Sequence, residues 1–104
     1  MATCTLMMVS RTNERMVDYM VDKIKANLYK LEQLERISDH AEADYDREPM
    51  NAEYEEAFDR AYQNEYNAFM LVASQIAELA GIDIKTAREI VRVKRDDLKR
   101  ILAY

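Results

Sequence analysis

The fold is decided by residues 52–102, which read AEYEEAFDRAYQNEYNAFMLVASQIAELAGIDIKTAREIVRVKRDDLKRIL. No glycine or proline interrupts residues 52–80, and apolar side chains recur there at the three- and four-residue spacing of one helix face. These apolar positions are Tyr54, Phe58, Ala61, Tyr62, Phe69, Val72, Ala73, Ile76 and Ala80. The pattern predicts one unbroken helix over about 52–80.

Residues at both ends of this segment predict where the helix starts and stops. Asn51 is a preferred N-cap residue, and Glu53, Glu55 and Glu56 place negative charge in the first turn, where the helix dipole favours it. Gly81 follows the last apolar position and suits the left-handed conformation that ends helices. Asp83 then caps a further helix, predicted to run to about residue 102.

An earlier segment predicts the partner of this helix. An apolar stripe falls on one face from residue 16 onwards, comprising Met16, Val17, Met20, Val21, Ile24, Leu28, Leu31 and Leu34. Ser10 or Thr12 can cap the start of this helix, and Pro49 disfavours helical backbone at Glu48, so the helix should end before that residue. We therefore expect a first helix over about 12–43.

Together these segments predict an all-α protein of three helices. It is expected to be a long antiparallel pair, about 12–43 and 52–80, with a third helix, about 83–102, folded back after Gly81. We expect a single domain over 1–104, with residues 1–10 either flexible or docked on the bundle. Three long helices bury their stripes poorly alone, so a homodimer is also expected.

Composition sets limits on the function. Gly81 is the only glycine, so no glycine-rich phosphate loop can form, and the single histidine, His40, argues against a histidine-rich metal site. We therefore expect no enzyme activity, catalytic residue, cofactor or resident metal. No apolar run is long enough to span a membrane, and one cysteine allows no internal disulfide, so we expect a soluble, cytoplasmic protein.

Residues 73–91 contain a second pattern, Ala-Ser-Gln-Ile-Ala-Glu-Leu-Ala-Gly-Ile-Asp-Ile-Lys-Thr-Ala-Arg-Glu-Ile-Val. It resembles the helix-turn-helix signature of small bacterial and phage regulators, with a small residue at Ala77 where two helices cross and a turn at Gly81. The resemblance implies that the helix after Gly81 enters the DNA major groove. The implied nucleic-acid-binding residues are Lys85, Thr86, Arg88, Arg92, Lys94, Arg95 and Lys99.

A tyrosine-bearing acidic stretch predicts a different function. Residues 39–65 hold 10 acidic and 2 basic side chains, while the whole chain carries a net charge of −5. Carboxylates and tyrosines on a helix suit docking onto a protein with a basic surface. In size, charge and helicity the chain resembles small acidic phage inhibitors such as anti-CRISPR proteins. The predicted partner-binding residues are Asp44, Tyr45, Asp46, Glu48, Glu55, Glu56, Asp59, Glu65 and Tyr66.

Three functions remain open at this point. The leading prediction is a protein-binding regulator, an inhibitor or adaptor of nucleic-acid-handling machinery, that acts through the acidic tyrosine-bearing face. The alternatives are a helix-turn-helix regulator that binds DNA and a purely structural oligomerising bundle. Glu65 bears on the first, because it projects from the middle of an apolar face and needs a partner or water.

Overall fold

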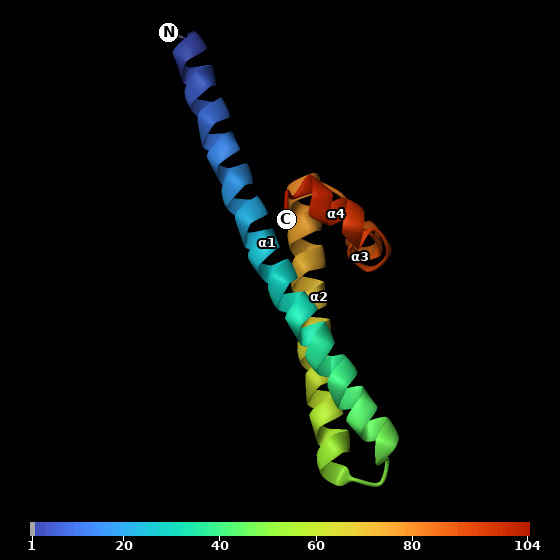
Figure 1. Ribbon diagram of the computed structural model, residues 1–104. Coiled ribbons are helices and arrows are strands. Elements are labelled where there is room, and N and C mark those ends of the chain that lie inside the picture. Colours follow the sequence, from blue (N-terminus) through green and yellow to red (C-terminus); the bar gives the residue numbers. More distant parts are fainter. Residues whose placement is uncertain (1) are drawn as a thin grey trace.

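The computed structural model describes the backbone of residues 2–104 and the side chains of residues 15–104. Its helices are α1 (Ala2–Arg47), α2 (Ala52–Ala80), α3 (Ile84–Val93) and α4 (Arg95–Ile101), and residues 2–104 contain no strand. α1 and α2 form an antiparallel hairpin, and α3 and α4 fold back at the end opposite its turn (Figure 1). The molecule is a rod of 72 × 21 × 20 Å. The all-α class is confirmed, whereas the three-helix arrangement is not.

The core is one continuous cluster at the upper half of the hairpin. Ile24, Leu28 and Leu31 of α1 pack there with apolar residues of the other three helices. These are Val72, Ala73 and Ile76 of α2, Ala87 and Val91 of α3, and Leu98 and Leu102 in and just after α4. Asn27 lies beside this cluster and donates a hydrogen bond of 3.0 Å from Nδ2 to Oε1 of Gln75, which satisfies the polar group within the α1 stripe.

The predicted bounds of α2 are confirmed, and so is the chemistry at both of its ends. The Asn51 side chain accepts hydrogen bonds from the backbone N–H groups of Glu53 and Tyr54, at 3.0 and 3.4 Å. Gly81 adopts φ 66° and ψ 34°, and the N–H of Ile82 donates to the carbonyl of Ala77. This is the Schellman closure that glycine favours, because it lacks the Cβ that strains left-handed backbone.

The first helix is longer than predicted. It begins at Ala2 rather than near Thr12, and it ends at Arg47 rather than near Ala43. Ser10 and Thr12 therefore lie inside the helix, because nothing in residues 2–11 breaks it: the segment lacks Gly and Pro and contains the strong helix formers Ala, Leu and Met. The prediction that residues 1–10 dock on the bundle concerns side chains outside those described.

The predicted helix over 83–102 is also wrong, because it is split in two at Lys94. Lys94 has φ −109° and ψ 32°, outside the helical region. The Arg95 side chain donates from Nε to the carbonyl of Val91 at 3.0 Å, in place of the backbone N–H that would continue the helix. Asp96 and Asp97 then lie in the first turn of α4, where their charge favours a new helix start.

Candidate protein-binding surface

The two long helices bring carboxylates and tyrosines onto one outward face of α2. Glu55, Asp59, Tyr62 and Tyr66 follow one another at intervals of four, three and four residues, the spacing of a single helix face. All four are exposed, including Tyr62 at 58% and Tyr66 at 43%. We call this set the acidic ridge. Tyr62 was predicted to be a core residue, and its exposure corrects that assignment.

The ridge exists because the core of the hairpin is narrow. At its lower half α2 contacts only α1, so one face of α2 is buried, at Ala61, and the opposite side remains open to water. Phe58 fills the inner side, where its ring packs against Tyr45 of α1 with centroids 5.8 Å apart and against Tyr62 at 6.4 Å. The inward aromatic contact holds Tyr62 at the edge of the ridge.

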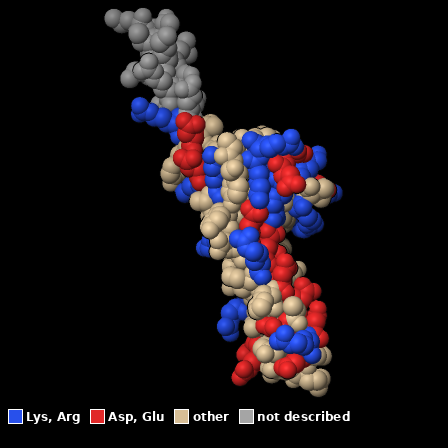
Figure 2. All heavy atoms as spheres, in the orientation of Figure 1, with Lys and Arg blue, Asp and Glu red and all other residues tan. Residues whose placement is uncertain are grey.

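Other predicted acidic residues lie at the hairpin turn. Asp44 is half-buried and accepts a 3.0 Å hydrogen bond from Arg47, with His40 3.9 Å away. Glu48 accepts a 3.3 Å hydrogen bond from Asn51, while Asp46 and Glu56 are exposed. Red surface follows the lower half of the rod, and blue surface predominates around α3 and α4 (Figure 2). On this face the turn end of the rod is therefore more acidic than the α3–α4 end.

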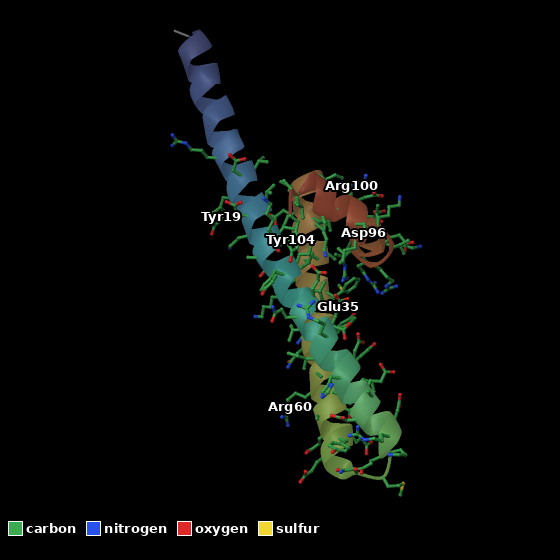
Figure 3. The ribbon with its side chains drawn as sticks, viewed as in Figure 1. Tyr19, Glu35, Arg60, Asp96, Arg100 and Tyr104 are labelled. Atoms are coloured by element: carbon green, nitrogen blue, oxygen red, sulfur yellow. The ribbon has the colours of Figure 1, made fainter. Side chains whose placement is uncertain are left out.

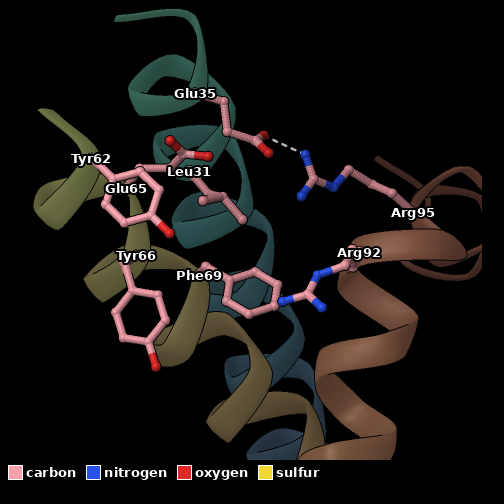
Figure 4. A pocket seen from close by; sticks show the side chains of 8 residues that line it. All are labelled: Leu31, Glu35, Tyr62, Glu65, Tyr66, Phe69, Arg92 and Arg95. Carbon is pink, nitrogen blue, oxygen red and sulfur yellow. Dashed lines mark hydrogen bonds and ion pairs between the residues drawn. The ribbon is translucent and has the colours of Figure 1, made fainter. Parts of the chain in front are cut away.

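Glu65 does not join the turn residues but lines a cleft above them. The cleft has a volume of about 340 Å³ and lies between the hairpin and the α3–α4 end. Figure 4 shows its lining side chains, which are Leu31, Glu35, Tyr62, Glu65, Tyr66, Phe69, Arg92 and Arg95. The ridge thus runs into this cleft through the two tyrosines. The structure divides the predicted acidic face into a turn group and a ridge with its cleft.

The two basic side chains that line the cleft, Arg92 and Arg95, already make contacts within the chain. Arg95 forms an ion pair with Glu35 of α1, and the Arg92 guanidinium lies 5.4 Å from the ring centroid of Phe69. Among the described residues, Glu65 has no hydrogen-bond or ion-pair partner. The cleft therefore presents one unpaired carboxylate beside two tyrosine rings.

The residues predicted to contact nucleic acid have unequal surroundings. Lys99 donates to Glu32 at 2.6 Å, Arg95 is paired with Glu35, and Arg92 packs on Phe69. Arg88 is half-buried, and its Nε has no hydrogen-bond partner. Lys85 and Lys94 are the predicted cations that remain exposed without such contacts in the described part of the chain, and Thr86 is exposed beside Asp83.

The geometry of the corner between α2 and α3 is well defined. Gly81, Ile82 and Asp83 form the three-residue connection, and the two helices are bent by 118°. Asp83 occupies the N-cap position, where hydrogen bonding to Thr86 lowers the pKa of its carboxyl.

Tyr62, Glu35 and Phe69 line the cleft but were not predicted from the sequence as site residues. Only Tyr62 carried a signal in the sequence, because it lies three residues after Asp59 and four residues before Tyr66.

The described residues show no arrangement that points to a particular reaction. Residues 15–104 contain no group of three His, Cys, Asp or Glu side chains placed to hold a metal ion. Within the described range no single helix is long and apolar enough to cross a membrane; only α2 and α3 taken together, across their bend, meet those two criteria. The chain matches no protein-family model, no curated protein and no solved structure.

Proposed function

We propose that this chain is a protein-binding regulator that docks on a basic partner through the acidic ridge, an inhibitor or adaptor rather than an enzyme. The observation that carries the proposal is the ridge itself, with Glu55, Asp59, Tyr62 and Tyr66 exposed in one line on α2. Tyrosines are rigid contact residues with a polar tip, and carboxylates beside them select a cationic surface and speed encounter.

The distribution of ion pairs supports the same proposal. The long-range ion pairs of the described residues join α4 to α1, where Arg95 and Lys99 pair with carboxylates of α1. Glu55 and Asp59 have no such partner among the described residues. A partner that supplies the missing cations would gain from pairing them. Proteins that handle nucleic acids present basic surfaces of this kind, which makes them the class of partner we favour.

The test compares two charge reversals of equal size. Glu55→Lys with Asp59→Lys changes the ridge, and Glu78→Lys with Glu89→Lys changes exposed carboxylates at the other end of the rod. Each protein is used to capture partners from nuclease-treated bacterial extract. We expect partners that the unaltered protein and the second variant retain and that the ridge variant loses. Retention of the same partners by the ridge variant would refute the ridge as the docking surface.

DNA binding through α3 is the second candidate, supported by the α2–α3 corner. Helix-turn-helix pairs meet at about 90–120° across a short turn, and this corner has a 118° bend and three connecting residues. Lys85, Thr86 and Lys94 are exposed on this side of the molecule. The ion pairs of Arg95 and Lys99 leave fewer cations for phosphate than the sequence predicted, so this candidate ranks second.

A gel-retardation experiment separates the two candidates. DNA binding predicts that a mixed-sequence duplex is retarded at low salt and that Lys85→Ala with Lys94→Ala abolishes the shift. Lys30→Ala with Arg36→Ala removes the same charge from exposed positions of α1 and should leave the shift intact. Absence of any shift at micromolar protein would remove the DNA-binding candidate.

A further inference from the structure

Two side chains of opposite charge line the cleft without pairing with each other. Glu65 belongs to α2 and Arg92 to α3 (Figure 4). In the part of the chain whose side chains are described, neither forms an ion pair. Arg95 and Glu35 line the same cleft and do form one, so an arginine from the α3–α4 end can reach a carboxylate of the hairpin here. The cleft therefore retains one unpaired charge of each sign.

Arg92 packs on an aromatic ring instead of reaching Glu65. Its guanidinium lies 5.4 Å from the ring centroid of Phe69. A cation–π contact satisfies no hydrogen bond, so the N–H donors of the guanidinium remain available to an acceptor in the cleft. Glu65 is half-buried, and a charge in that position is screened less by salt and water than an exposed one. Both groups would therefore gain from a ligand that supplies their missing counter-charges.

The rest of the lining is apolar and aromatic. Leu31 and Phe69 contribute to it, together with Tyr62 and Tyr66. The volume of about 340 Å³ lies at the lower end of the range for small-molecule sites, roughly 300–1,000 Å³. Such sites combine a largely apolar wall with a few polar groups that fix the orientation of the ligand. The cleft has this composition, at a size that suits a molecule comparable with one amino acid.

We propose that the cleft binds a small zwitterion with an apolar or aromatic side group, of which an aromatic α-amino acid is the simplest example. The ammonium of the ligand pairs with Glu65, and its carboxylate accepts hydrogen bonds from the guanidinium of Arg92, which can donate two in parallel. The side group packs on the aromatic wall.

A zwitterion fits the charge balance of the cleft better than a simple ion does. Arg95 and Glu35 neutralise each other, and Glu65 and Arg92 also sum to zero. A purely cationic ligand would leave Arg92 without an anion, and a purely anionic ligand would bring its charge toward Glu65. The proposal does not rest on the acidic ridge binding a protein.

An NMR titration of the full chain with three related probes tests the ligand class. The probes are L-phenylalanine, L-phenylalanine amide, which lacks the carboxylate, and N-acetyl-L-phenylalanine, which lacks the ammonium. L-Phenylalanine should shift the amide signals of cleft residues saturably. Each analogue should bind at least about tenfold more weakly, because it loses one charge-assisted contact.

The analogues also distinguish a free zwitterion from the end of a peptide. Equal binding of the amide would identify a site for a peptide amino end, and equal binding of the acetyl compound a site for a carboxyl end. Either result would overturn the proposal, and so would the absence of saturable shifts at millimolar L-phenylalanine.

Two variants assign the charges of the ligand to the two residues. Glu65→Gln should weaken binding of the amino acid and the amide but not of the acetyl compound, whereas Arg92→Gln should weaken the amino acid and the acetyl compound but not the amide. Glu78→Gln and Lys85→Gln remove the same charges from exposed positions and should change none of the three affinities. Far-UV circular dichroism checks that each variant remains helical. Variants at 65 and 92 that bind all three probes like the unaltered chain would refute the assignment. No probe is a protein, so these results are independent of the partner-capture experiment.

Discussion

The ammonium Nζ of Lys99 lies 2.6 Å from Oε2 of Glu32, and this contact ties α4 to α1 across 67 residues of sequence. Arg95 and Glu35 form a second such pair one turn away. Both pairs are partly buried, so solvent screens them less than a surface pair. Figure 3 shows Glu35 and Tyr104 near this junction of the C-terminal helices with α1. The ion pairs therefore position α4 over the core.

Acid should weaken this junction. Partial burial raises the pKa of Glu32, but the hydrogen bond and the positive charge of Lys99, with smaller effects of Tyr104 and Arg95, lower it by more than burial raises it. The pKa of Glu32 therefore lies below its ordinary value of 4.5. A carboxyl with a lowered pKa stabilises the fold above the unfolded pKa, and the contribution is lost as pH falls through the folded pKa. Urea titrations above and below pH 4.5 should show unfolding free energy decreasing with acid. Glu32→Gln should reduce this slope, whereas Glu42→Gln, an exposed control, should not; equal slopes would contradict the assignment.

Truncation of a buried core side chain should be costly, whereas truncation of an exposed side chain in the turn should not. Leu28 is fully buried against α2 and α3, so Leu28→Ala should reduce the unfolding free energy by about 2–5 kcal/mol through lost burial and a cavity. Met50 is 95% exposed in the turn, and Met50→Ala should change stability by no more than about 0.5 kcal/mol. Chemical denaturation at one fixed protein concentration measures both. Similar losses for the two variants would be inconsistent with the described core.

Gly81 should be sensitive to backbone strain alone. Its φ is +66°, and a Cβ added there would meet nothing within 4 Å. Gly81→Ala should therefore cost about 1 kcal/mol, from left-handed strain without a steric clash. Gly81→Asn should cost less, because asparagine tolerates this conformation. The same denaturation experiment ranks the two variants, and an alanine variant as stable as the original chain would show that the corner relaxes.

The stability that the N-cap of α2 contributes should depend on the hydrogen-bond acceptor in the side chain of residue 51. Asn51→Ala removes the oxygen that accepts from the backbone of Glu53 and Tyr54 and should cost about 1 kcal/mol. Asn51→Ser retains an acceptor and should recover most of the loss. Thermal melts followed by circular dichroism provide the comparison. If serine and alanine melt at the same temperature, the cap contributes no stability.

Local chemistry accounts for the elements that sequence predicts well. Asn51 and Gly81 set both ends of α2 through bonds made within a few residues, so neither needs the rest of the fold. The start of α1 was misplaced because capping residues only permit a helix start and do not require one. The break at Lys94 was missed for a different reason: it accompanies the Arg95 side chain turning toward Val91 and Glu35, a contact 60 residues away in sequence.

The candidate surface was predicted in part for the same reasons. Glu55 and Asp59 are recognisable as outward residues because their spacing matches the helix period and both carry charge. Tyr62 was placed in the core because an aromatic residue at an apolar position suggests burial, but α2 has only one neighbour at that height. The cleft could not be predicted from the sequence, because Glu35, Glu65 and Arg92 come from three different helices that only the folded structure brings together.

The slender shape of the molecule has a consequence for simultaneous binding. The molecule is a rod 72 Å long and about 20 Å thick. The turn lies at one end of this rod, and the α3–α4 group lies well away from it. Two macromolecules can therefore occupy the turn region and the opposite half at once without collision.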